Sequence, residues 1–308
     1  MHTENVYARL EAAVRGYVIA QAGGDPSGDL SLMPLGELVT VFFSWRARHI
    51  PARPRICHVS QEMQASATAS EHKDELAALI AKIEAGADLT PHLSRGVVNA
   101  YEPGGDKKKT WRRSDRDLLI ADWGVHHLHL SGAVEQDGFV ERADDLLFAM
   151  FTKTDSYLIG IYPHGSWGLV ELLEIVVRNW PDAGLMLPTH AIGLTQKWTD
   201  AERLELRNGG IASPFIELDG KVWAASALGQ SLDGKASKAS VRSMDFMWRL
   251  GQWEDDPEHL LAEAERVMND AAGRALKGNW TPMVDAEGTL GLLREDVFYG
   301  LLSLADSG

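Results

Sequence analysis

The run Trp123–Ser131, which reads Trp-Gly-Val-His-His-Leu-His-Leu-Ser, constrains this chain more than any other stretch. In an extended strand, successive side chains point to opposite faces. His127 and His129 therefore share one face, and Leu128 and Leu130 share the other. Because the leucines favour a core, the two histidines are expected to point together away from it. The run predicts a strand that carries a pair of imidazoles.

Apolar runs on both sides of this stretch predict a central antiparallel sheet, with strands expected at Leu118–Ala121, Val125–Ser131, Leu146–Phe151 and Tyr157–Tyr162. The intervening segments carry turn signals such as Gln136-Asp137-Gly138. His164 follows the last run and Arg142 precedes the third. The predicted sheet thus brings a third imidazole and a guanidinium towards the pair.

The flanking regions combine helical and strand patterns, so the fold class predicted is α+β. Apolar residues at helical spacing indicate helices at Asn5–Gln21, Leu35–Trp45, Lys73–Glu84, Trp167–Asn179, Ser243–Leu250 and Pro257–Ala275. Asp219-Gly220 between alternating runs is typical of a hairpin turn. The polar connector Tyr101–Arg116 suggests three parts: a mainly helical region at 1–100, the central sheet at 101–190 and a mixed region at 191–308.

The amino-acid composition indicates a soluble globular protein. The chain has 308 residues, of which 45% are hydrophobic and 24% charged, and it has one cysteine, Cys57. These values are ordinary for a soluble domain and exclude a disulfide framework or a cysteine-rich zinc module. No apolar run approaches the length that spans a bilayer, and the N-terminus lacks the pattern of a signal peptide. A cytoplasmic protein without membrane association is expected.

The net charge of −14 argues against coating of nucleic acid by bulk electrostatics. One short segment nevertheless concentrates cations around an aromatic ring, namely Lys107, Lys108, Lys109, Trp111, Arg112, Arg113 and Arg116. Cations can guide a phosphate backbone while an indole stacks on a base. This segment is the candidate RNA-binding element, although a solvated loop would have the same composition.

The residues that converge on the predicted sheet suit RNA cleavage without a metal. Such cleavage needs a base for the 2′-hydroxyl proton, an acid for the leaving 5′-oxygen and a cation for the charge on phosphorus. Histidine titrates near neutral pH and can fill either proton role, and arginine matches phosphate geometry. His127 or His129, with His164 and Arg142, would supply all three roles. The leading hypothesis is an endoribonuclease that needs no cofactor.

The same stretch resembles the compact sheet of the RelE/ParE-like toxins. The resemblance lies in His127–Leu130, in Arg142–Phe148, which reads Arg-Ala-Asp-Asp-Leu-Leu-Phe, and in Tyr157–His164. It covers about 50 of the 308 residues and implies an mRNA-cleaving or phage-defence protein, with RNA as substrate and an antitoxin or another protein as partner. The whole chain also resembles a bacterial family whose signature, Asp-Trp-Gly-x-His-His-Leu-His-Leu, is found here at residues 122–130; this resemblance implies no biochemical function.

A metal site is the second hypothesis. His-x-His on a strand is a common arrangement in zinc and iron sites. His164 would be the third ligand of the His127/His129 pair, with Asp122 as a carboxylate. The zinc or iron would then activate water for hydrolysis. No complete hydrolase motif such as His-Glu-x-x-His is present.

Two further interpretations stay open. A histidine on a strand is often a hydrogen-bonded residue of the sheet without a catalytic role, and His126, on the leucine face, fits this description best. Arg142 can simply pair with a nearby carboxylate. The second is a protein that binds a partner without catalysis, with the helical arms that flank the sheet as the interaction surface.

Overall fold

The computed structural model describes residues 6–25, 28–98, 118–229 and 236–305. These residues divide into two compact units, each assembled from separate parts of the chain. As far as it is described, one unit comprises residues 6–43 and 239–305, and the other comprises residues 44–98 and 118–238. The predicted connector at 101–116 lies outside the described residues. The α+β class expected from the sequence is confirmed, because both units combine helices with sheets.

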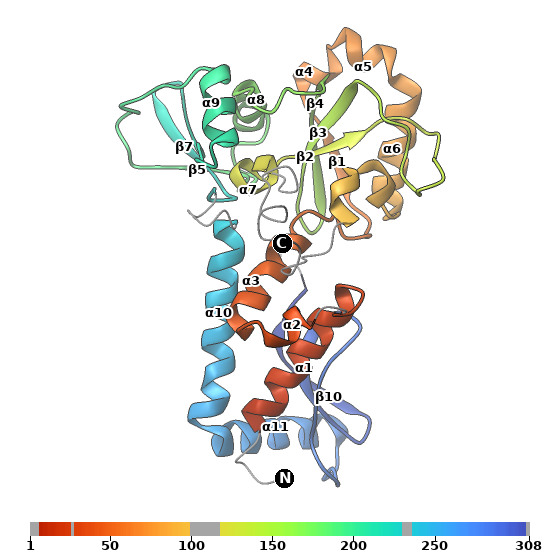
Figure 1. Cartoon of the computed structure of the whole chain (residues 1–308), viewed down its shortest axis with the longest axis vertical. Helices are drawn as coiled ribbons and strands as arrows, with labels where there is room; N and C mark the ends of the chain where they lie inside the picture. Colours follow the sequence, from red (N-terminus) through yellow and green to blue (C-terminus); the bar gives the residue numbers. More distant parts are fainter. Residues whose placement is uncertain (1–5, 26–27, 99–117, 230–235, 306–308) are drawn as a thin grey trace. The chain divides into compact units, whose positions relative to one another are not determined.

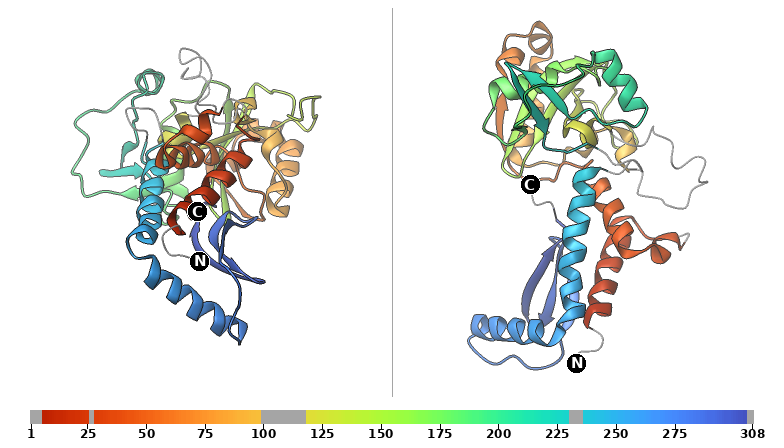
Figure 2. Two further views of the ribbon diagram at one scale, coloured as in Figure 1. Left: turned by 60° about the horizontal axis from the view of Figure 1, so that its bottom comes forward. Right: turned by 90° about the vertical axis from the view of Figure 1, so that its left-hand side faces the viewer.

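The first unit joins helices from both ends of the sequence to a three-stranded antiparallel sheet of order β10-β9-β8. Its elements are α1 (Val6–Gln21), α2 (Asp29–Leu32), α3 (Leu35–Arg46), α10 (Ser237–Asp255), α11 (Pro257–Ala272), β8 (Thr281–Val284), β9 (Thr289–Arg294) and β10 (Val297–Ser303). Asp256 caps α11 by accepting a hydrogen bond from the His259 N–H group. The two helices α10 and α11 meet at a sharp angle (Figures 1 and 2), and Asp256 between them has non-helical backbone angles, φ −141° and ψ 64°.

The second unit holds the predicted central sheet. Its helices are α4 (Gln61–Gln64), α5 (Ala67–Glu71), α6 (Lys73–Ala85), the 3-10 turns η2 (Thr90–His92) and η3 (Arg95–Val98), α7 (Leu118–Trp123), α8 (Glu171–Asn179) and α9 (Asp200–Asn208). Its strands are β1 (Ile56–Val59), β2 (His126–His129), β3 (Asp145–Phe151), β4 (Asp155–Pro163), β5 (Met186–Pro188), β6 (Phe215–Leu218) and β7 (Lys221–Ala225).

The central sheet has the order β1-β4-β3-β2. Strands β2, β3 and β4 form the predicted antiparallel meander, whereas β1 pairs with β4 in parallel. The sheet is therefore mixed rather than wholly antiparallel. Strand β1 was not expected, because it is only four residues long and follows a proline-containing stretch.

Two expected elements differ from the structure. Leu118–Ala121, expected as a strand, belongs to helix α7, because a short buried apolar run has no periodicity that separates strand from helix. The helix expected to start at Trp167 begins at Glu171, with Val170 as its N-cap residue.

Both faces of the central sheet are covered (Figure 1). On one face, side chains of α4, α5 and α6 pack with Leu128, Leu130 and Leu147. On the other face, α8 packs between the central sheet and the small sheet β5-β7-β6, with Leu146 and Phe148 in this second core. The two inner strands, β3 and β4, are consequently buried on both faces along most of their length. None of the described helices is both long and apolar enough to cross a bilayer.

Candidate functional site

Strand β2 presents its histidines to the second core. His127 lies opposite Phe148 and His129 lies opposite Leu146, and both of these partners pack towards α8. The two histidines thus share a face and point away from the leucine core. That face is not open, however: His127 is half-buried and His129 is only 4% exposed.

His164 and Arg142 lie at the end of the sheet where β3 begins and β4 ends. The N–H group of His164 donates to the carbonyl oxygen of Asp144 at 2.6 Å, so the segments beside β3 and β4 run side by side. Both side chains are exposed. They therefore reach solvent next to a buried histidine.

Trp167, which the sequence did not single out, joins two of the histidines. Its ring centre lies 4.6 Å from that of His127 and 5.1 Å from that of His164, and 5.6 Å from the ring of Phe148. The indole is half-buried. Only its place in the loop after β4 could have indicated this role. We call His127, His129, His164, Arg142 and Trp167 the histidine cluster.

The electrostatic environment of His129 shows that these groups lie together. Burial of the ring lowers the pKa of His129 to about 4, with further lowering from charge on His127, Arg142, His164 and Arg95. Burial disfavours the charged imidazolium, and nearby positive groups act in the same direction. His129 is therefore a neutral imidazole at pH 7, and every electrostatic neighbour that lowers its pKa is a cation or an imidazole that can become one.

One ring nitrogen of His129 has no hydrogen-bond partner among the residues that the structure describes. Its Nδ1 atom is buried and makes no hydrogen bond to the described residues. A buried polar atom without a hydrogen bond costs about 1–3 kcal/mol.

Asp122, proposed from the sequence as a metal ligand, is committed elsewhere. It lies in α7, fully buried, with Oδ2 3.0 Å from Nη2 of Arg207 in α9 and Oδ1 3.0 Å from the N–H group of Ser213. In the structure this carboxylate thus pairs with a buried guanidinium, and its role as a metal ligand stays a prediction. Within the described ranges, no three His, Cys, Asp or Glu side chains are arranged to hold a metal ion.

The candidate RNA-binding residues cannot be compared with the structure. Lys107, Lys108, Lys109, Trp111, Arg112, Arg113 and Arg116 lie outside the described residues.

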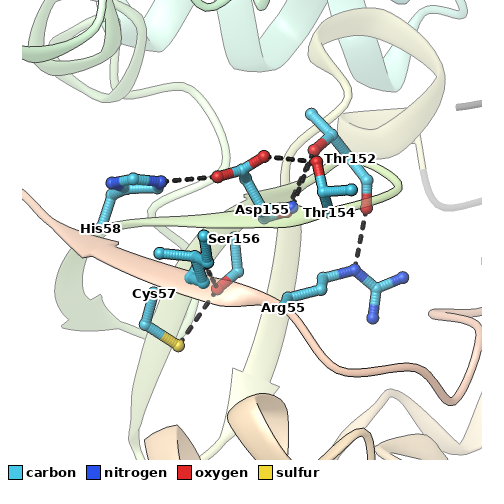
Figure 3. Close-up of polar contacts among 8 residues, drawn as sticks. Arg55, Cys57, His58, Thr152, Thr154, Asp155 and Ser156 are labelled. Atoms are coloured by element: carbon cyan, nitrogen blue, oxygen red, sulfur yellow. Dashed lines mark hydrogen bonds and ion pairs between the residues drawn. The ribbon is translucent and has the colours of Figure 1, made fainter.

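A second polar group lies at the β1 edge of the same sheet (Figure 3). Nε2 of His58 is 2.7 Å from Oδ1 of Asp155, and the Thr154 hydroxyl donates to the other carboxylate oxygen at 2.6 Å. The hydroxyl of Ser156 lies 3.2 Å from Sγ of Cys57, and burial raises the pKa of that thiol. Cys57 therefore stays a protonated thiol at neutral pH, and the group ties β1 to β4.

Comparison with family models, curated proteins and solved structures finds no match for this chain.

Proposed function

We propose that the histidine cluster cleaves RNA by general acid–base catalysis without a metal. The observation that carries the proposal is that the Arg142 guanidinium and two further imidazoles, His127 and His164, lie beside a neutral, buried His129 in a protein whose net charge is −14. A site that gathers positive groups against the overall charge favours an anionic ligand. Imidazoles beside it add proton transfer, which suits a phosphodiester.

The reaction divides between residues according to their exposure and charge. A neutral imidazole of the His127/His129 pair takes the proton of the 2′-hydroxyl, whose oxygen attacks phosphorus. The bond from phosphorus to the 5′-oxygen breaks, and His164 gives that oxygen a proton. Arg142 offsets the charge that develops on the phosphoryl oxygens. The products are a 2′,3′-cyclic phosphate and a free 5′-hydroxyl.

The biological setting is part of the same proposal. Cleavage of cellular RNA would make the protein toxin-like or a phage-defence factor, which an antitoxin or another protein could restrain. Single-stranded RNA in the cytoplasm is the expected substrate, and a protein with one cysteine needs no oxidising compartment. The segment Lys107–Arg116 is the proposed guide for the RNA backbone.

The test compares purified wild type with His129→Gln, His164→Gln and Arg142→Gln on a labelled single-stranded RNA in EDTA. His190→Gln, at an exposed residue outside the cluster, is the matched control. We expect each histidine variant of the cluster to lose about 10²–10⁴-fold in rate, and the control to match wild type. An RNA with 2′-deoxy sugars should resist cleavage.

Two outcomes would contradict the proposal. The ribonuclease proposal would be contradicted if the wild-type protein left RNA intact and its induced expression caused no growth arrest. If cleavage stopped in EDTA and returned when zinc was added, the activity would be metal-dependent hydrolysis and not metal-independent acid–base catalysis.

A further inference from the structure

His92 is a buried histidine that lies outside the histidine cluster but contacts its central member. It belongs to turn η2 and is 2% exposed. Its Nδ1 atom lies 2.8 Å from the main-chain oxygen of His129. A carbonyl oxygen only accepts hydrogen bonds, so Nδ1 of His92 carries a hydrogen and donates it.

Lys82 determines the state of the other ring nitrogen. Its ammonium Nζ in α6 lies 2.9 Å from Nε2 of His92. An ammonium group only donates, so Nε2 accepts and carries no hydrogen. Burial lowers the pKa of His92, and the charge of Lys82 lowers it further. These contacts select one neutral tautomer, with the hydrogen on Nδ1.

The position of β2 in the sheet makes the hydrogen bond from His92 to the His129 carbonyl important. Among the strands that the structure describes, β2 is an edge of the sheet, with β3 as its one neighbouring strand, so no other described strand holds it from outside. The His129 carbonyl, at the last residue of β2, is held instead by an imidazole from another segment. A shift of this residue would move the His129 ring relative to its neighbours.

The segment that carries His92 is itself anchored. Leu89 and Leu93, on either side of η2, are buried in the leucine core of the sheet. The carbonyl oxygen of Pro91 accepts a hydrogen bond from the N–H group of Val140 at 2.9 Å. Nε of Arg95 lies 2.5 Å from Oδ2 of Asp137, and Arg95 also pairs with Glu135. These contacts tie η2 and η3 to the loop that leads to Arg142.

We propose that His92 is a positioning residue of the histidine cluster: its imidazole, held in one tautomer by Lys82, fixes the main chain of His129 among His127, His164 and Arg142. This inference rests on the proposed function for its catalytic consequence. The geometry of the contact can be tested without it.

The first test is the nitrogen-15 NMR spectrum of the imidazoles in the full-length protein at pH 7. We expect His92 to be neutral with its hydrogen on Nδ1. In Lys82→Met the pKa of His92 should rise, because the neighbouring ammonium is removed. A hydrogen on Nε2 in wild type, or an unchanged His92 pKa in Lys82→Met, would overturn the assignment.

The second test uses two substitutions of different chemistry. His92→Phe keeps a ring but no donor, whereas His92→Asn keeps an N–H donor near the position of Nδ1. We expect His92→Phe to shift the His129 ring signals and to lower kcat by about tenfold or more, since small misplacement of a catalytic group is costly. His92→Asn should restore most of the rate. His58→Phe, which removes a histidine bond at the opposite edge of the sheet, is the matched control and should keep the wild-type rate.

The outcomes separate the two proposals. A folded His92→Phe with unchanged His129 signals and rate would overturn the positioning role. If His92→Phe does not fold, the test rests on His92→Asn. The positioning role would then be overturned if His92→Asn lost the wild-type His129 signals and the wild-type rate. If wild type does not cleave RNA, the proposed function fails, while the tautomer of His92 and the His129 signals still decide the positioning.

Discussion

The carboxylate of Asp122 lies 3.0 Å from the guanidinium of Arg207, and both side chains are buried. The pair joins α7 to α9, and the guanidinium carbon of Arg207 lies 4.1 Å from the ring centre of Trp123. The segment just before β2 is therefore held by a buried ion pair with a partner 85 residues later in the chain.

Replacing Asp122 should destabilise the protein strongly. Asp122→Ala leaves the Arg207 guanidinium buried without its counter-charge, which typically costs about 3–5 kcal/mol. Urea unfolding measures the free energy directly. Asp245→Ala removes an exposed ion pair with Arg249 on α10 and should cost less than about 1 kcal/mol. Equal losses in the two variants would show that Asp122 is not a structural residue.

The stability of the protein should depend on pH through His129. The pKa of His129 is about 4 in the folded protein, against 6.5 for an unperturbed histidine in the unfolded chain. The folded state therefore disfavours a proton that the unfolded state binds. Above pH 6.5 this group does not reduce the free energy of unfolding. As pH falls from 6.5 towards 4, the free energy of unfolding decreases by a total of roughly 3 kcal/mol.

His129→Gln isolates this contribution, because glutamine does not titrate. Urea unfolding of both proteins from pH 8 to pH 4.5 should give a smaller loss of free energy in the variant. Parallel pH curves for the two proteins would mean that His129 titrates normally.

Gly168 should not tolerate a side chain. A Cβ atom there would lie 2.4 Å from the carbonyl oxygen of Asp200 and 3.1 Å from Cβ of Leu204, both in α9. Gly168→Ala must move backbone and should cost about 1–3 kcal/mol. Gly251→Ala is the control, since its site in α10 is open and alanine favours a helix. Thermal unfolding should show a lower Tm for the first variant and an unchanged or higher Tm for the second.

Trp167 should affect two histidines at once. Its indole lies against the rings of His127 and His164, so Trp167→Leu should change the NMR shifts of both imidazoles by removing the ring current. Under the proposed function, the rate of RNA cleavage should fall about tenfold or more, because both imidazoles lose a support. Trp198→Leu, at a partly exposed tryptophan in a loop, should change neither the imidazole shifts nor the cleavage rate. Unchanged His164 signals would contradict the contact.

Local patterns in the sequence were sufficient for several elements. The spacing of Val6, Leu10, Val14 and Val18 determines helix α1. Asp219 and Gly220 both have positive φ, as the hairpin turn between β6 and β7 requires. Alternation along β2 separated the histidines from the leucines. Each of these features depends on neighbours within a few residues, and the α+β class follows from them.

Tertiary structure decided what the histidine face contacts. Strand β1 pairs with β4 from about 100 residues away, and α8 covers the face that was expected to be open. Trp167, His92 and the pairing of Asp122 with Arg207 likewise depend on residues distant in sequence. Alternation states which side chains share a face, but burial and charge depend on what packs there, because desolvation and Coulomb forces act through space. The sequence alone therefore determined a histidine pair on a strand, and only the tertiary structure decided that one of the pair is a buried, neutral imidazole held by a third histidine.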